Sequence, residues 1–380
     1  MNFVALKMLM GDRAKYLSLV FTVAFASFLM ANQSSIFAGI MKRTASQIID
    51  VVDADIWVMD PQTQYVDEIK PLTENDLYRV RGLPGVEWAV RFFKGLARAT
   101  AKDGKFRNVI LLGVDDATLV GVPHGKMLLG SVEDLKLPDT VIIDRAGFKF
   151  FFPNAPLSRG ETFELNDRRA RIVGIAEASA PFATFPVFYT RYSQALQYVG
   201  QERNLMSYVL VKAKPGISPE RLTKRIQSET GLRALTGEGF FWQTIKYYQK
   251  HTGIPVNFGI TIAVGLIVGT VVAGQTFYIF TLENLKQFAA LKAIGVSDLR
   301  IVGMILLQAL VVGGIGYAIG MGLCAVFFEI TLQQIATRGL VLMWQNMVGT
   351  GVLVIFIVMV ASLLSIRRVL VLEPAVVFRG

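Results

Sequence analysis

The chain has 380 residues, of which 53% are hydrophobic and 18% charged, and its formal net charge is +10. No Lys/Arg stripe with interleaved aromatic residues concentrates that charge on one element, which argues against a nucleic-acid-binding protein. Four long runs hold most of the hydrophobicity and contain no ionised side chain in their interiors. Each can cross a membrane, because about 20 apolar residues span about 30 Å of hydrocarbon. We interpret as transmembrane helices residues 16–40, 255–281, 300–328 and 347–366.

The first run has an alternative interpretation, which is a secretory signal peptide. Three basic residues precede it, and Ala-Phe-Ala at residues 24–26 resembles a cleavage site. The apolar part of a signal peptide usually covers about 7 to 15 residues, whereas no charge occurs here from Tyr16 until Lys42. We therefore predict a retained membrane helix, preceded by a cytoplasmic interfacial helix over residues 1–15.

Residues 41–251 have the composition of an ordinary soluble domain, with 29 Lys and Arg against 24 Asp and Glu. The segment is long enough to bury its own core. It mixes a helix capped at Thr73, paired strands around a turn at residues 103–104, and a later helix that begins at Pro219. Two α/β units thus flank a β-rich middle of roughly residues 105–190. We predict an α-helical membrane protein with four transmembrane helices and a large extracytoplasmic α+β domain, made of split α/β units with a β-rich insertion.

Residues that could carry out chemistry are sparse. His124 and His251 are separated by a whole domain, and no Cys/His cluster has metal-ligand spacing. Asp115 and Asp116 follow a strand, where a turn is the better interpretation than a catalytic pair. Cys324 is the only cysteine, so no intrachain disulfide can form, and we interpret it as a small buried residue. We predict no catalytic residue, no metal site and no ATP-hydrolysing motif in this chain.

Orientation follows from the basic residues beside the membrane runs. Nine Lys and Arg lie near the membrane on one side and five on the other. By the positive-inside rule, both termini and residues 282–297 are cytoplasmic, and residues 367–380 form a cytoplasmic tail. Residues 41–251 and the short loop 329–346 are then extracytoplasmic.

Small residues recur every four positions in three of the runs. Such spacing lets helix backbones approach closely in a membrane, although glycine is also simply common in membrane helices. The interiors of the runs hold no Asp, Glu, Lys, Arg or His, which argues against a transporter that relays protons or ions. We predict helix-packing or dimer contacts at Ser27, Ala31, Ser35, Gly265, Gly269, Ala273, Gly316 and Gly320.

Residues 282–297 form a charged helical segment between the second and third runs. At about 100° per residue, one apolar stripe contains Leu282, Leu285, Phe288, Ala289 and Ala293. A loop helix needs only one apolar stripe to lie against its own protein, so a second stripe indicates a docking partner, the alternative being a solvated connector. Gly295 can end the helix in a left-handed conformation. The second stripe contains Glu283, Gln287, Ala290, Leu291 and Ile294.

At LENLKQFAALKAIGVSDLRIVGMILLQALVVGGIGYAIG, residues 282–320, the chain resembles the coupling segment and following helix of FtsX-like ABC transporter permeases. The resemblance is to the macrolide-exporter or type VII group, and especially to its heterocyst glycolipid exporter branch. The layout is similar along the whole chain: an interfacial stretch NFVALKMLMGDRAK, one helix, a large exported domain, three helices and the ending RRVLVLEPAVVFRG.

The resemblance implies a homodimeric permease of the bacterial inner membrane, with the first two helices at the dimer centre. It implies separate ABC ATPase subunits that hold ATP and magnesium, no cofactor in this chain itself, and a porter-like exported domain built from residues 41–96 and 206–237. Export would use a periplasmic membrane-fusion adaptor and an outer-membrane channel, with membrane lipid around the helices. The implied ATPase-coupling residues are Glu283, Gln287, Ala290, Leu291, Ile294, Gly295 and Val296.

Three alternatives remain. An FtsX-type signalling permease would activate an envelope hydrolase, and binding of a hydrolase instead of an adaptor would reveal it. A lipoprotein- or lipid-extracting permease would share the same layout. A membrane-bound enzyme is disfavoured, because no nucleophile, base and orienting residue occur together in a recognisable motif.

Overall fold

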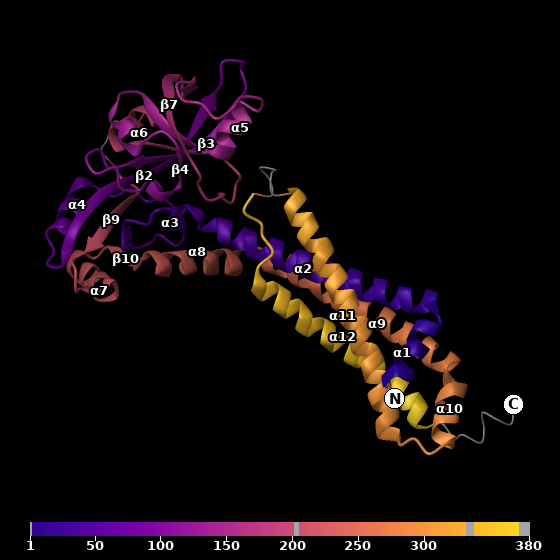
Figure 1. The fold of residues 1–380 in the computed structure, drawn as a ribbon. Coiled ribbons are helices and arrows are strands. Elements are labelled where there is room, and N and C mark those ends of the chain that lie inside the picture. The colour runs from indigo at the N-terminus through magenta and orange to yellow at the C-terminus, as the bar shows by residue number, and fades with distance from the viewer. Residues whose placement is uncertain (1, 201–204, 332–337, 372–380) are drawn as a thin grey trace. The chain divides into compact units, whose positions relative to one another are not determined.

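The computed structural model describes residues 2–200, 205–331 and 338–371, and the chain divides into two units (Figure 1). We call the first the helical unit, which comprises Met1–Gly39 and Gly253–Gly380. The second, Ile40–Thr252, we call the sheet domain. A helical membrane part with a large α/β domain is the fold class that the sequence predicts, and the structure confirms it.

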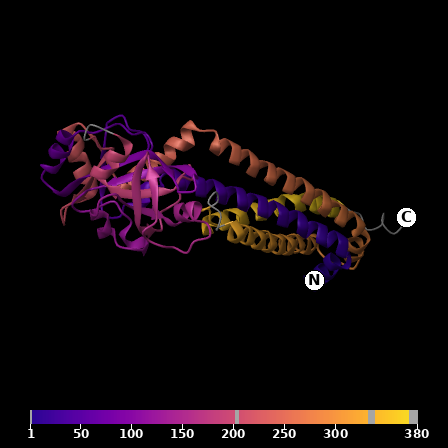
Figure 2. The ribbon, with the colours of Figure 1, turned by 90° about the horizontal axis from the view of Figure 1, so that it is seen from above.

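The helical unit contains four helices that are long and apolar enough to cross a membrane within the described residues. They run alongside one another in both views (Figures 1 and 2). At about 1.5 Å per residue each is longer than the roughly 30 Å of hydrocarbon, so their ends can project beyond it. The helices are α1 (Asn2–Gly11), α2 (Arg13–Thr44), α9 (Ile254–Glu283), α10 (Leu285–Ala293), α11 (Asp298–Thr331) and α12 (Trp344–Leu370), of which α1 and α10 are the short ones.

The sheet domain is built on one path of paired strands, in the order β10-β1-β9-β2-β3-β8-β5-β7-β4, with β6 pairing to β2 and β7. The strands are β1 (Ile56–Met59), β2 (Val86–Thr100), β3 (Phe106–Val114), β4 (Met127–Leu129), β5 (Thr140–Asp144), β6 (Thr162–Leu165), β7 (Arg168–Ala176), β8 (Val187–Arg191), β9 (Tyr208–Ala213) and β10 (Arg233–Thr236). The helices are α3 (Ser46–Asp50), α4 (Glu74–Arg81), α5 (Arg145–Phe151), α6 (Tyr192–Val199), α7 (Pro219–Thr230) and α8 (Gly237–His251), with 3₁₀ turns η1 (His124–Lys126) and η2 (Val132–Lys136).

Strand β2 joins the two halves of this sheet. Its first part, from Val86 to Phe92, pairs with β9, and its second part, from Phe93 to Thr100, pairs with β3. The predicted insertion therefore shares a strand with the flanking α/β units and does not form a separate sheet. One cluster of buried apolar side chains runs through both halves, which makes the domain a single packing unit.

Local sequence explains where several elements begin and end. Thr73 and Asp76 form a capping box at the start of α4, which satisfies backbone N–H groups that have no partner inside the helix. Helix α7 starts with Pro219 and ends at Thr230, and it is followed by Gly231, whose φ of +72° is left-handed. The turn between β2 and β3 contains Gly104 at a φ of +81°.

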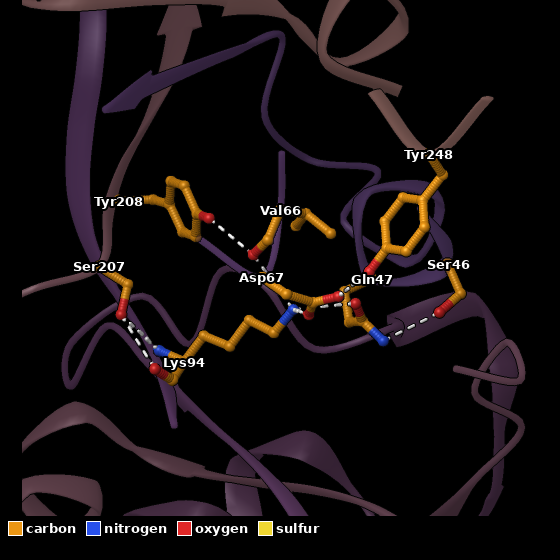
Figure 3. A network of polar contacts seen from close by, with 8 residues as sticks. All are labelled: Ser46, Gln47, Val66, Asp67, Lys94, Ser207, Tyr208 and Tyr248. Carbon is orange, nitrogen blue, oxygen red and sulfur yellow. Dashed lines mark hydrogen bonds and ion pairs between the residues drawn. The ribbon is translucent and has the colours of Figure 1, made fainter. Parts of the chain in front are cut away.

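A buried ammonium ties several segments of the sheet domain together (Figure 3). Lys94 on β2 donates to Gln47 Oε1 of α3 at 3.1 Å, to the Val66 carbonyl at 3.2 Å and to the Asp67 carboxylate. The Tyr248 hydroxyl of α8 donates to the other Asp67 oxygen at 3.2 Å. Burial lowers the pKa of Lys94, and Asp67 partly offsets that effect. The network thus links strand β2 to α3, which follows α2 in the chain, and to α8, which precedes α9.

Candidate docking site

Helix α10 is a short helix held between two breaks in the helical unit. Helix α9 ends at Glu283 and α10 begins at Leu285, with Asn284 between them. At the other end, the Ile294 N–H donates to the Ala290 carbonyl at 3.1 Å, and Gly295 follows with a φ of +91°. That left-handed residue lets the chain reverse into α11 without strain, because glycine has no Cβ.

One side of α10 is packed against its own chain. Phe288 and Ala289 are fully buried, and Phe288 joins Ile301 and Ile305 of α11 and Val369 of α12 in one apolar cluster. Burial of such side chains stabilises the packing by about 1.5–3 kcal/mol each. Helix α10 is therefore fixed on the ends of two long helices and is not a free connector.

Lys292 adds a polar clamp on the same side. Its ammonium donates to the Leu370 carbonyl at 3.0 Å and lies 3.0 Å from Asp298. These contacts join α10 to the last turn of α12 and the first turn of α11. The sequence interpretation missed this role, although Lys292 lies about 200° around the helix from Ala290 and so belongs to the inward side.

The opposite side of α10 is exposed. Gln287, Ala290 and Ile294 all face away from the protein, and Ile294 is 77% exposed. At 100° per residue, Gln287 and Ile294 lie about 60° and 40° from Ala290 on the same side of it. The exposed Lys286 and Ala293 lie about 40° and 60° from Ala290 on the other side, so Ala290 is the centre of an exposed arc. We call Gln287, Ala290 and Ile294 the docking face.

The other residues of the predicted coupling set are placed differently. Glu283 and Gly295 are exposed at the two ends of α10, whereas Leu291 and Val296 are half-buried, and Val296 packs against the apolar cluster. The predicted inner stripe needs a correction, because Leu282 and Ala293 are exposed. Leu282 belongs to α9, and the break at Asn284 changes the helical phase on which the stripe depended.

A groove between α1 and α10 adjoins the docking face. Its volume is about 560 Å³, and Glu283 and Gln287 line it together with Phe3 and Lys7 of α1. Glu283 forms an ion pair with Lys15, which also lies 2.8 Å from Asp12. Hydrogen bonds from Lys15 lower the pKa of Asp12. The groove is thus a surface with both apolar and charged groups, which suits a protein partner.

The small residues of the long helices are used for packing within this one chain. A Cβ on Gly320 would lie 2.5 Å from the Ala24 carbonyl oxygen, and a Cβ on Gly269 would lie 2.8 Å from the Ala26 Cβ. The Asn346 amide donates to Ser35 Oγ at 3.1 Å. Contacts of these residues with a second copy stay a prediction. All eight predicted packing residues are buried inside the single chain: Ser27, Ala31, Ser35, Gly265, Gly269, Ala273, Gly316 and Gly320.

Comparison with known families assigns both units. Residues 18–229 match the model of a MacB-like periplasmic core domain. Residues 259–374 match the FtsX-like permease C-terminal model. The first match alone covers more than half of the chain.

Individual proteins and structures are similar as well. A protein named an uncharacterized ABC transporter permease from Mycobacterium tuberculosis (strain ATCC 25618 / H37Rv) is 28% identical over 315 residues, which are 82% of this chain and 80% of that protein. One of the same description from Mycobacterium bovis (strain ATCC BAA-935 / AF2122/97) is 27% identical over 316 residues, again 82% and 80%. The periplasmic region of MacB from Actinobacillus actinomycetemcomitans matches with a TM-score of 0.39 at 16% identity, over 54% of this chain and 96% of that one.

Proposed function

The chain belongs to the family with a MacB-like periplasmic core domain and an FtsX-like permease C-terminal part, and we propose that a separate ATPase subunit drives it by docking on α10. It is an ABC transporter permease of the MacB/FtsX type. The proposal places the α10 end of the helical unit in the cytoplasm and the sheet domain outside the bacterial inner membrane.

The observation that carries the proposal is the two-sided environment of α10. Its inner side is fixed by Phe288, Ala289 and Lys292, and its outer side presents Ala290 beside Gln287 and Ile294. A helix fixed on one side transmits a push to the helices that hold it, because packed interfaces do not deform continuously. A partner that covers the exposed Ile294 side chain lowers the free energy, since burying an apolar side chain is favourable.

Movement at α10 has a direct route to the sheet domain. Helix α2 continues from the helical unit to Thr44 in the sheet domain without a break, and only two residues lie between the end of α8 and the start of α9. We propose that these two connections carry ATPase-driven motion from one unit to the other. ATP and magnesium would be held by the ATPase, and this chain would supply neither the nucleotide site nor a cofactor.

The proposed output is export with a periplasmic membrane-fusion adaptor and an outer-membrane channel. The match to a MacB-like periplasmic core domain supports this output. A homodimer, and membership of the heterocyst glycolipid exporter branch that residues 282–320 resemble, are further parts of the proposal. Co-purification of an adaptor with the full-length permease would support export, and co-purification of an envelope hydrolase would replace it with signalling.

Substitution of Ala290 tests the docking of the ATPase. We expect Ala290→Glu to abolish co-purification of the ATPase, because a small contact at the centre of the exposed arc is replaced by a desolvated, unpaired carboxylate that costs about 3–5 kcal/mol. Permease levels should stay normal, since Ala290 is exposed. The measurement is a pull-down from membranes with matched amounts of permease.

Two controls separate docking from general effects of the substitution. Ala290→Ser keeps a small side chain and should retain the ATPase. Ala117→Glu makes the same chemical change at an exposed alanine of the sheet domain and should also retain it. Normal ATPase binding by Ala290→Glu would reject α10 as the docking helix.

A further inference from the structure

An open surface cleft with several positive charges lies over helix α8, strand β10 and Gln64 of the sheet domain. Its volume is about 370 Å³, within the range of about 300–1,000 Å³ that is usual for ligand sites. We call it the basic cleft and define it by Arg233, Lys246, Tyr247, Lys250 and His251.

The cleft is built partly from fixed groups. Arg233 donates to the Thr63 carbonyl at 3.0 Å and to Gln243 Oε1 at 2.7 Å, which holds the guanidinium in place. Tyr247 stacks on Tyr65 with ring centroids 4.2 Å apart, and on His251 at 4.5 Å. One wall therefore carries a fixed cation and a stacked aromatic group.

Its lysines have no counter-ion in the part of the chain that the structure describes. Among the described residues, no carboxylate lines the cleft, and neither Lys246 nor Lys250 forms an ion pair. The sequence contains no acidic residue between Glu238 and Glu283. Like charges gathered without a partner repel one another, so an anion in the cleft would be favoured.

The cleft also lies close in the chain to a membrane-spanning helix. His251 is three residues before Ile254, where α9 begins, so their Cα atoms are at most about 11 Å apart in any arrangement of the two units. Val256 and Ile260, in the first turns of α9, are apolar side chains that are 65% and 58% exposed in the single chain, which fits a helix that begins in a membrane. The headgroup region occupies about 5–8 Å on each side of the hydrocarbon.

We propose that the basic cleft binds the phosphate of an anionic phospholipid headgroup at the membrane surface where α9 begins. Lys246, Lys250 and Arg233 supply the positive charge, and hydrogen bonds to a charged phosphate are stronger than those to a neutral group. Bound lipid would hold the end of α8 at the membrane surface. The proposal requires only that α9 spans the membrane, and it does not depend on the ATPase.

The test uses the full-length chain, purified in detergent and titrated with phosphatidylglycerol. Native mass spectrometry would count the retained lipids, and thermal melting would follow stabilisation as lipid is added. We expect the double variant Lys246→Gln/Lys250→Gln to bind the lipid more weakly. The lipid concentration at half-saturation should rise by about tenfold or more, since each cation near an anionic headgroup contributes to binding. Lys246→Arg/Lys250→Arg keeps both charges and should retain binding.

The matched control is Lys214→Gln/Lys224→Gln, which removes two exposed lysines elsewhere in the sheet domain and should leave lipid binding unchanged. Equal loss in the two glutamine variants would overturn the proposal, because the effect would then be one of net charge. Equal stabilisation by phosphatidylcholine would also overturn it. Inorganic phosphate that displaces the lipid at millimolar concentration would show a site for free phosphate and would likewise reject a lipid site.

Discussion

Lys94 and Asp67 differ in how far each side chain is exposed to water. This difference determines how much stability the domain loses when either side chain is removed. The Lys94 side chain is 6% exposed and donates to three acceptors, whereas the Asp67 side chain is 40% exposed. A carboxylate left alone at Asp67 can be hydrated. An ammonium left alone at Lys94 cannot, so it would remain an uncompensated buried charge.

We predict that Asp67→Ala destabilises the sheet domain more than Lys94→Met does. The first change leaves the buried ammonium without its counter-ion and should cost on the order of 3 kcal/mol of stability. The second replaces the ammonium with an apolar chain of similar length and should cost about 1 kcal/mol or less. Melting temperatures of the two full-length variants in the same detergent would measure the difference. A larger loss for Lys94→Met would show that the hydrogen bonds of Lys94 matter more than its charge.

At the scale of elements, the sequence predicts local periodicity well and non-local pairing poorly. The exposed arc around Ala290 follows from 100° per residue, because α10 is regular over that stretch. The prediction failed at Leu282, since a break at one residue shifts the phase of everything before it. The paired strands around Gly104 were also predictable from their turn. The pairing of the first part of β2 with β9 was not predictable, because it joins segments that are distant in the sequence.

The packing of α2 on α11 gives a matched test on one helix. A Cβ at Gly320 would meet the Ala24 carbonyl oxygen at 2.5 Å, whereas a Cβ at Gly322 would meet nothing within 4 Å. We predict that Gly320→Val lowers the melting temperature of the purified permease, with an overpacking cost of about 1–3 kcal/mol or more. Gly322→Val should be close to neutral. Equal behaviour of the two variants would mean that α2 and α11 do not approach closely.

At the scale of the whole molecule, the long helices differ in how much the single chain covers them. Only 17% of the most apolar window of α9 is buried, against 44% for α2 and 33% for α11. The small residues of α9 already face inward, so its outer surface is a stripe of large apolar side chains. Large side chains can interlock between helices without the close backbone approach that glycine allows. The stripe consists of Val256, Ile260, Val264, Val268 and Val271.

We predict that this stripe lies near the two-fold axis of a dimer. In a symmetric dimer, a residue near the axis meets its own copy, so one cysteine there can form a disulfide with itself. With the buried Cys324 replaced by alanine, Val268→Cys should give a crosslinked dimer on oxidation in membranes, and Ile355→Cys on the exposed side of α12 should stay monomeric. Gel mobility without reductant distinguishes the two. Crosslinking through Ile355 but not through Val268 would move the dimer contact from α9 to α12.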